Sequence, residues 1–428
     1  MTPHSPLSAA RHDRLEPADA ALLALEERTG APQNVGCVLV FEGRAPALDE
    51  LTKLVSERLV GLPRHTARVL AVPLRLGRPV WAHAGDLDLA FHVRGESLAG
   101  RAGALERLAA RVLAAPLDRG RPLWELTLVE DAVPGGFALV VKAHAVLAGG
   151  GLVAALLADA PGAPVPRSAP APGSLGLAAG ALSSPRDAVH MVRALTTVAR
   201  EHGRRSPSPL AAAPGPLRRL ALIDADLELA RAAKERLGGT VNDVVLAALA
   251  GALGAHLRAL GEEPDGMRLR ALVPVAGARE GKLLAAFVPL PLGIADARRR
   301  HAEIARTLDG LRASGRAAGA GELSDRDGFA AAAMVTGAAR LAAAERGFDV
   351  AVANVPGPQR RHRLLGRELR AAHPVIPLTP GRALSVAVLS YGGRLCFGLL
   401  ADADALPDPG SLARATVQAL AELAPKAR

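Results

Sequence analysis

The chain has 428 residues, half of them hydrophobic but only 2% aromatic, so it is long enough for two domains with cores built mainly from Ala, Val and Leu. The net charge of +10 favours an anionic partner. No basic and aromatic stacking pattern accompanies the scattered arginines, so we expect no nucleic acid, whereas an anionic membrane surface or lipid droplet stays open as a partner.

The sequence lacks the motifs of several common classes of enzyme. There is no G-x-x-x-x-G-K-[ST] phosphate loop, no H-E-x-x-H and no G-x-S-x-G. Cys37 and Cys396 lie far apart in apolar, strand-like runs, so we expect buried free thiols, no thiolate zinc site and no metal. The N-terminus lacks an apolar signal region, and no apolar stretch is long enough to span a bilayer. We therefore expect a cytoplasmic protein, attached at most peripherally to the inner membrane face.

The first part of the chain alternates helices and strands. Helical spacing predicts helices over 15–26, 48–62 and 104–113, and an apolar run predicts a strand over 37–41. A second apolar strand begins at Phe137 and runs to His144, and a glycine run then precedes an Ala/Leu helix that ends at Leu157. His144 therefore lies where a strand gives way to a helix, a place where reactive groups collect in α/β proteins.

A Pro/Ala/Gly-rich stretch divides the sequence. It predicts an N-terminal domain over residues 1–160, a crossover linker with one helix over 161–216, and a C-terminal domain over 217–428.

The C-terminal part restarts with a strand over 217–223 and a helix over 226–237. Thr240 and Asp243 form a capping-box pattern that opens a buried helix over 241–259. Gly392-Gly393 joins two apolar strands and predicts a hairpin turn, and a last helix follows residues 402–408.

Several segments together resemble the bifunctional wax ester synthase/diacylglycerol acyltransferase family. The segment 142–150 resembles its HHxxxDG motif, and 116–125 resembles PLDRxRPLWE. Further matches are the strand with H-V-R at 86–94, the N-D motif at Asn242-Asp243, R-A-x-V-P-V at 270–275 and S-N-V-P-G-P at 353–358.

The resemblance implies an α/β fold of two chloramphenicol-acetyltransferase-like mixed-sheet domains with a channel between them. It also implies an O-acyltransferase that moves a fatty acyl group from acyl-CoA, as cosubstrate and without a bound cofactor, to diacylglycerol or a long-chain alcohol. The family's first motif histidine is His144 and its glycine is Gly150. The base position is Ala145 and the aspartate position is Gly149.

These two replacements leave two main functions open, besides acylation of a different acceptor with another base. The chain is either an O-acyltransferase or a catalytically degenerate member that binds acyl-CoA or lipid, or that partners an active paralogue. Because side chains alternate along a strand, His144 faces away from the side on which residue 145 lies. His144 could replace the base only if the strand slipped by one residue or contained a bulge. The other candidate for a substitute base is His373, beside the closing strands.

The remaining motif residues have packing roles in this interpretation. Pro122, Leu123 and Trp124 would place a large ring in the core, and the resemblance makes His92 a framework residue. For Asn242 and Asp243, a helix cap beside the channel and a catalytic role both stay open. The sequence does not specify acyl length, acceptor or oligomeric state.

Overall fold

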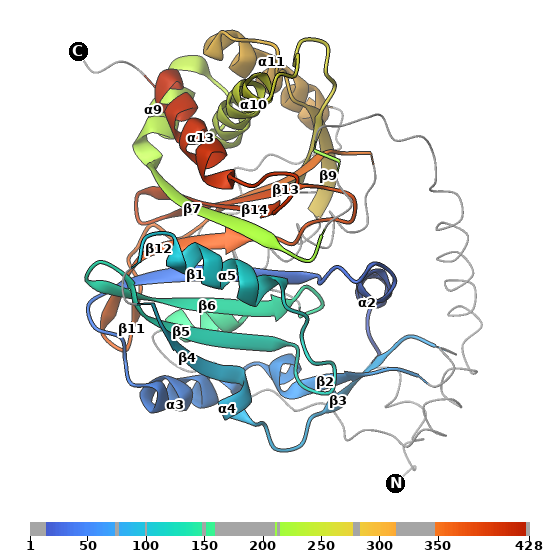
Figure 1. Cartoon of the computed structure of the whole chain (residues 1–428), viewed down its shortest axis with the longest axis vertical. Coiled ribbons are helices and arrows are strands. Elements are labelled where there is room, and N and C mark those ends of the chain that lie inside the picture. The colour runs from blue at the N-terminus through green and yellow to red at the C-terminus, as the bar shows by residue number, and fades with distance from the viewer. Residues whose placement is uncertain are drawn as a thin grey trace.

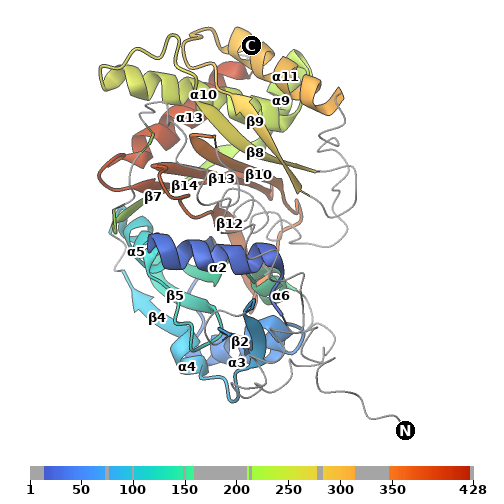
Figure 2. The same cartoon turned by 90° about the vertical axis from the view of Figure 1, so that its right-hand side faces the viewer.

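The computed structural model describes residues 14–72, 77–98, 101–147, 151–158, 210–211, 215–276, 283–313 and 347–424. Two mixed six-stranded sheets stack along the long axis of the molecule, each with its own helices (Figures 1 and 2). The α/β fold of two mixed-sheet halves expected from the sequence is confirmed. Most of the linker segment 161–216 and its expected helix lie outside the described residues.

The first sheet has the strand order β11-β12-β1-β6-β5-β4. Only the β4/β5 pair is parallel. The strands of this first sheet are β1 (Asn34–Glu42), β4 (Val93–Ser97), β5 (Trp124–Val133), β6 (Gly136–His144), β11 (Arg363–Leu364) and β12 (Arg367–Val375). The last two come from late in the chain, so residues 217–428 supply strands to both sheets. The predicted domain boundaries remain a prediction.

Helices cover both faces of the first sheet and its edge. They are α2 (Pro17–Thr29), α3 (Leu48–Leu59), α4 (Leu89–His92), α5 (Ala104–Ala114) and α6 (Gly151–Leu157). A short 3-10 turn (Pro63–Thr66) leads into a small hairpin of β2 (Ala67–Leu70) and β3 (Val80–His83). Helix α5 packs on β1 and also on the second sheet, so it lies at the junction (Figure 1).

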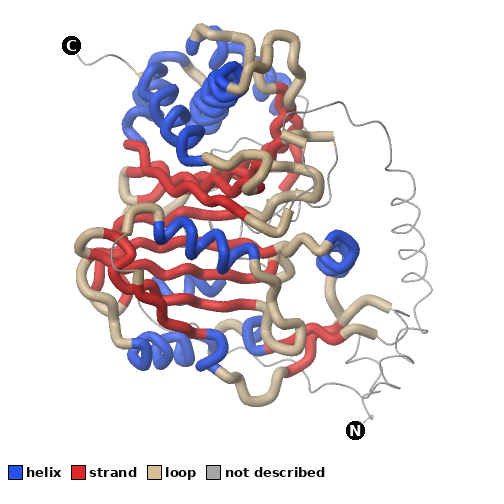
Figure 3. Tube along the Cα trace, in the orientation of Figure 1, coloured by secondary structure: helices blue, strands red, loops and turns tan. Residues whose placement is uncertain are grey.

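The second sheet has the order β7-β14-β13-β10-β8-β9, and β10 is parallel to both β13 and β8. Its strands are β7 (Arg218–Asp226), β8 (Arg270–Ala276), β9 (Leu283–Pro289), β10 (Val350–Pro356), β13 (Leu384–Tyr391) and β14 (Arg394–Asp402). Four helices cover its outer face (Figure 3): α9 (Leu227–Leu237), α10 (Val241–Ala259), α11 (Ala297–Ala313) and α13 (Pro409–Leu423).

Most local expectations hold because the apolar pattern matches one buried face. The predicted helix over 241–259 is α10, and its capping box is formed by Thr240 and Asp243. Gly392 and Gly393 both have positive φ, 52° and 82°, as a tight hairpin turn between β13 and β14 requires.

One local expectation was wrong. The segment 86–94, expected as a strand, contains helix α4 followed by the start of β4. Asp88 accepts a hydrogen bond from the Phe91 N–H at 3.2 Å, and this N-cap stabilises one helical turn where the strand was expected.

Candidate functional site

The end of β6 carries the residue singled out by the sequence, His144. Val146 N–H donates to His144 Nδ1 at 3.2 Å, which leaves the ring proton on Nε2. Nε2–H then donates to Glu26 Oε2 on α2 at 2.8 Å. The ring is 1% exposed. Both ring nitrogens therefore have partners, and the imidazole faces α2.

Glu26 is held by several donors at once. Gln33 N–H donates to Oε2 at 3.0 Å, and the Arg119 guanidinium lies 3.4 Å from Oε1. Burial alone would raise the pKa of Glu26, but the hydrogen bond and charge of His144, with Gln33 and Arg119, lower it to about 2. The carboxylate is therefore charged over the whole working pH range.

Ala145 follows directly and is fully buried. Its N–H donates to Gln33 O at 2.9 Å, which extends the β1/β6 pairing by one residue beyond the strand. Its side chain is a methyl group that can take no proton. Gly149 and Gly150 lie outside the described residues, so the geometry of the rest of the motif is not described.

The other motif residues of the first half lie in the core. Trp124 is fully buried, and its Nε1–H donates to His65 O at 2.7 Å. His92 stacks on the Trp124 ring with 4.5 Å between centroids, and its Nδ1 lies 2.7 Å from Trp124 O. Leu123 is buried beside them and its carbonyl accepts the His144 N–H at 2.9 Å. Pro122 precedes this pair. These contacts fit the packing roles expected for these residues.

The N-D motif lies at the start of α10. Asp243 accepts from Thr240 N–H at 2.9 Å and from the Thr240 hydroxyl at 2.7 Å, so it caps the helix. The neighbouring Asn242 is half-buried, and within the described part of the chain its Oδ1 has no hydrogen-bond partner. A catalytic role for either residue remains a prediction.

His373 lies on β12 and is 5% exposed. Its Nδ1 is 3.0 Å from Phe397 O and its Nε2 is 3.4 Å from Asp224 Oδ1. It lies opposite Val38 of β1, which in turn pairs with Val140 of β6, four residues before His144. The structure therefore does not bring His373 and His144 together at one point.

A cavity of about 900 Å³ opens between the two halves of the molecule. Its walls come from α5 and residues 29–32 on one side and from β7 and α13 on the other. Five arginines line it against two carboxylates. They are Arg107, Arg111, Arg218, Arg219 and Arg414, with Glu106 and Asp408. The segment 29–32 leads into Gln33, whose carbonyl binds Ala145 N–H, so one end of this basic cavity lies close to the motif. The sequence missed it because its arginines lie far apart in the chain.

Comparison with known proteins fits this architecture. The wax ester synthase/diacylglycerol acyltransferase catalytic domain model matches residues 15–200, and the WS/DGAT C-terminal domain model matches residues 282–424. A Mycobacterium tuberculosis protein named as a probable diacylglycerol O-acyltransferase is 30% identical over 421 residues, which cover 91% of this chain and 90% of the relative. The chain belongs to the wax ester synthase/diacylglycerol acyltransferase family.

Family members and more distant folds extend the match over the whole molecule. A second M. tuberculosis relative with a diacylglycerol O-acyltransferase name is 29% identical over 98% of this chain and 92% of its own. The solved wax ester synthase/diacylglycerol acyltransferase of Marinobacter aquaeolei VT8 has a TM-score of 0.69 at 26% identity, covering 96% of this chain and 98% of that one. A condensation domain of the calcium-dependent antibiotic synthetase, 17% identical with a TM-score of 0.59, covers 96% of each chain and shares the fold.

No single helix of the described residues is long and apolar enough to cross a membrane; α9 and α10 pass such a test only as a pair bent by 102°. Helix α10 is buried against α13 and α11, as expected for the core helix of this half.

Proposed function

We propose that the protein binds a long-chain acyl-CoA in the basic cavity and is an O-acyltransferase toward diacylglycerol or a long-chain alcohol, with a slow transfer step. The observation that carries the proposal is the cavity between the two halves. Five arginines and only two carboxylates line it, and one of its ends lies close to the motif at His144 and Ala145. The names of the relatives in M. tuberculosis and M. aquaeolei agree with this class of activity.

The charge of the cavity suits the coenzyme. Coenzyme A carries several phosphate charges, and guanidinium groups bind phosphate oxygens through paired, charge-assisted hydrogen bonds. Arg111 on α5 and Arg219 on β7 approach the cavity from opposite walls. The acyl chain is apolar and needs a path toward the motif, where the residues around Ala145 are buried and apolar.

The transfer step explains why the rate should be low. The acceptor oxygen attacks the thioester carbonyl, a C–O bond forms, the C–S bond breaks, and the hydroxyl proton must leave the oxygen as the thiolate departs. In the family a histidine takes this proton, and the corresponding position here is Ala145. A positioned base contributes ~10²–10⁴ in rate, so transfer that depends on bound water and positioning alone is slow.

A second function is favoured by the hydrogen bonds of His144. Because both of its ring nitrogens already have partners, His144 is poorly placed to replace the missing base. A family member without a base would hold acyl-CoA or lipid without turnover, or would act beside an active paralogue. The net charge of +10 would support loose attachment to an anionic membrane surface or lipid droplet in either case.

The experiment that tests the proposal measures acyl-CoA binding by isothermal titration calorimetry. The double variant Arg111→Gln/Arg219→Gln should bind palmitoyl-CoA at least ~10-fold more weakly than the parent, because each lost charged hydrogen bond contributes about 1.5–3 kcal/mol. Binding of palmitoyl-pantetheine, which lacks the nucleotide phosphates, should change little.

The matched control is Arg231→Gln/Arg298→Gln, which removes the same charge from the exposed surfaces of α9 and α11. If both double variants weaken palmitoyl-CoA binding equally, net charge and not the cavity is responsible. If the folded parent binds no palmitoyl-CoA, the proposal fails. Labelled palmitoyl-CoA with diacylglycerol or hexadecanol then separates slow transfer from binding alone.

A further inference from the structure

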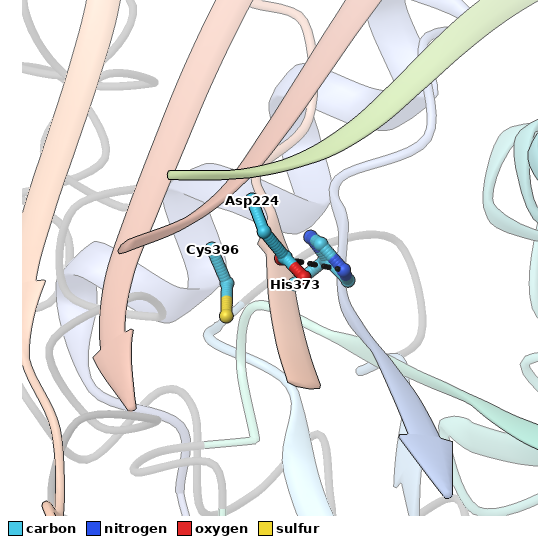
Figure 4. A group of neighbouring side chains, drawn as sticks. All are labelled: Asp224, His373 and Cys396. Atoms are coloured by element: carbon cyan, nitrogen blue, oxygen red, sulfur yellow. Dashed lines mark ion pairs between the residues drawn. The ribbon is translucent and has the colours of Figure 1, made fainter. Parts of the chain in front are cut away.

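Three side chains with metal-binding atoms meet where the two sheets touch. His373 comes from β12 of the first sheet, while Asp224 on β7 and Cys396 on β14 are paired neighbours in the second sheet. Their carboxylate oxygen, imidazole nitrogen and sulfur atoms all lie within 4.8 Å of one another. Figure 4 shows the three side chains as neighbours, with a dashed line for the ion pair between Asp224 and His373.

The hydrogen bonds of His373 fix where its lone pair points. Its Nδ1 lies 3.0 Å from the Phe397 carbonyl oxygen, which can only accept, so Nδ1 carries the proton. In the neutral ring Nε2 then presents a lone pair to Asp224 Oδ1, 3.4 Å away. Two acceptor atoms therefore face each other, as two ligands of one cation do.

The His373 ring is buried, only 5% exposed, between the Phe397 carbonyl and Asp224. Glu106 and Arg394, which have opposite charges, also lie within reach of the ring. Asp224 Oδ1 is itself buried and has no hydrogen-bond partner among the described residues. The Cys396 thiol is the donor that reaches the Asp224 carboxylate when no metal ion is bound.

Cys396 does not look like a nucleophile in this arrangement. Its side chain is fully buried, and burial, with the charge of Asp224, raises the pKa of the thiol. A protonated, inaccessible thiol reacts slowly with electrophiles. The same thiol becomes a strong ligand once a metal ion displaces its proton.

We propose that Asp224, His373 and Cys396 form a zinc site that clamps the first sheet to the second. The 3.4 Å separation of Nε2 and Oδ1 matches the edge of a tetrahedron with Zn–N and Zn–O bonds of ~2.0–2.1 Å, which is about 3.3–3.4 Å. In such a tetrahedron a sulfur at ~2.3 Å from the ion lies about 3.6 Å from the other two ligand atoms, and the three atoms here lie within 4.8 Å of one another.

The ligand types select the metal. A thiolate with an imidazole suits Zn²⁺, whereas Mg²⁺ and Ca²⁺ prefer an all-oxygen set. The donation from Nδ1–H to a backbone carbonyl is the outer contact that metal-bound histidines usually make. The thiolate and the carboxylate together balance the two charges of the ion, and a water molecule would complete four-coordination.

Binding is balanced by the release of one proton. Zn²⁺ takes the Cys396 sulfur as a thiolate, and the thiol proton passes to solvent; no electron is transferred. Asp224 keeps 25% of its side chain exposed, so the ion would enter past this carboxylate. Arg394, 3.4 Å from Oδ2, holds the second carboxylate oxygen away from the site.

The test uses Co²⁺ as a spectroscopic probe for the purified, metal-stripped full chain. One equivalent of Co²⁺ should produce the visible bands of a tetrahedral ion and a near-ultraviolet thiolate-to-cobalt charge-transfer band, and Zn²⁺ should displace both. Cys396→Ser should abolish the charge-transfer band and weaken Co²⁺ binding by at least ~10²-fold, since even outer contacts of a metal site contribute 10–100-fold. Asp224→Asn and His373→Gln should weaken binding comparably.

Cys37→Ser is the matched control, because Cys37 is the other buried thiol and lies outside the cluster. It should leave the charge-transfer band unchanged. Loss of the band in this variant, a parent that is folded by circular dichroism but gives no thiolate band, or equal Co²⁺ affinity in Cys396→Ser would each overturn the proposal. A Zn²⁺-dependent rise in the melting temperature of the parent, absent in Cys396→Ser, supports the clamp.

Discussion

Oε2 of Glu26 lies 2.8 Å from Nε2 of His144, so a buried hydrogen bond joins helix α2 to the end of the central strand β6. This contact gives His144 a structural partner on the face opposite to that of Ala145. The hydrogen bond orients His144, the first histidine position of the motif. Together with the contacts of Gln33, it fixes the turn that contains Ala145, the position of the missing base.

The first prediction concerns this bond. Glu26→Gln should lower the free energy of unfolding at pH 7 by about 1.5–3 kcal/mol, because it removes charge-assisted hydrogen bonds in a buried place. The folded-state pKa of about 2 lies below the ordinary 4.5, so the stabilisation is complete above pH 4.5 and is lost as the pH falls toward 2. Urea unfolding of parent and variant across this range should show the difference shrinking.

Glu27→Gln is its control, since Glu27 is on the same helix, is more exposed and pairs with Arg119 at the surface. It should cost less than ~1 kcal/mol. Equal losses in the two variants would show that the bond to His144 contributes no special stability.

The second prediction concerns the contact between the sheets. A Cβ atom at Gly398 would lie 2.1 Å from the carbonyl oxygen of Pro374, so β14 and β12 approach too closely for any side chain. Gly398→Ala should destabilise the protein by about 1–3 kcal/mol or more, as overpacking does. Gly310→Ala on α11 has open space and should be neutral or stabilising by about 0.5–1 kcal/mol. Thermal unfolding that ranks the two variants in the reverse order would contradict the close approach of the strands.

The third prediction separates the two residues of the N-D motif. Thr240→Ala removes the cap of α10 and should cost about 1 kcal/mol. Asn242→Ala removes an amide oxygen without a partner among the described residues, so stability should change by less than ~0.5 kcal/mol. Chemical denaturation measures both. A large loss for Asn242→Ala would assign that amide a structural role and remove its candidacy for the site.

The fourth prediction concerns membranes. If the net charge of +10 attracts the protein to anionic lipid, flotation with phosphatidylserine liposomes should recover much more protein at low than at high salt. The contribution is roughly 1 kcal/mol for each basic residue close to the surface. Salt-independent flotation, or recovery equal to that with neutral liposomes, would exclude this attraction.

Much of the fold could be predicted because the sequence pattern is local. The capping box and apolar run of 241–259, the paired glycines at 392–393 and the apolar strand that ends at His144 are all signals that neighbouring residues carry. Residues 86–94 differed from the predicted strand because Asp88 caps a short helix there. That cap depends on side-chain geometry, which the strand-like composition of the segment does not reveal.

The non-local features were not predictable. The crossing of β12 into the first sheet joins residues more than 300 positions apart, and no periodicity encodes it. For the same reason Asp224, His373 and Cys396 share no sequence spacing typical of a zinc site, although the structure places their ligand atoms within 4.8 Å. Strand alternation did indicate that His144 and position 145 face opposite ways, and the bond of His144 to Glu26 agrees with it.

The measurement that tests the central claim most directly restores the missing base. Steady-state cleavage of palmitoyl-CoA with diacylglycerol present is compared for the parent, Ala145→His, and Ala145→His/Gly149→Asp. The parent should be nearly inactive, the double variant should be faster by at least ~10²-fold, and the single variant should recover less, because the aspartate shapes the loop that carries the imidazole in the family. A parent that turns over at ordinary enzyme rates, on the order of 1–10³ per second, would contradict the account, and so would a folded double variant with no gain.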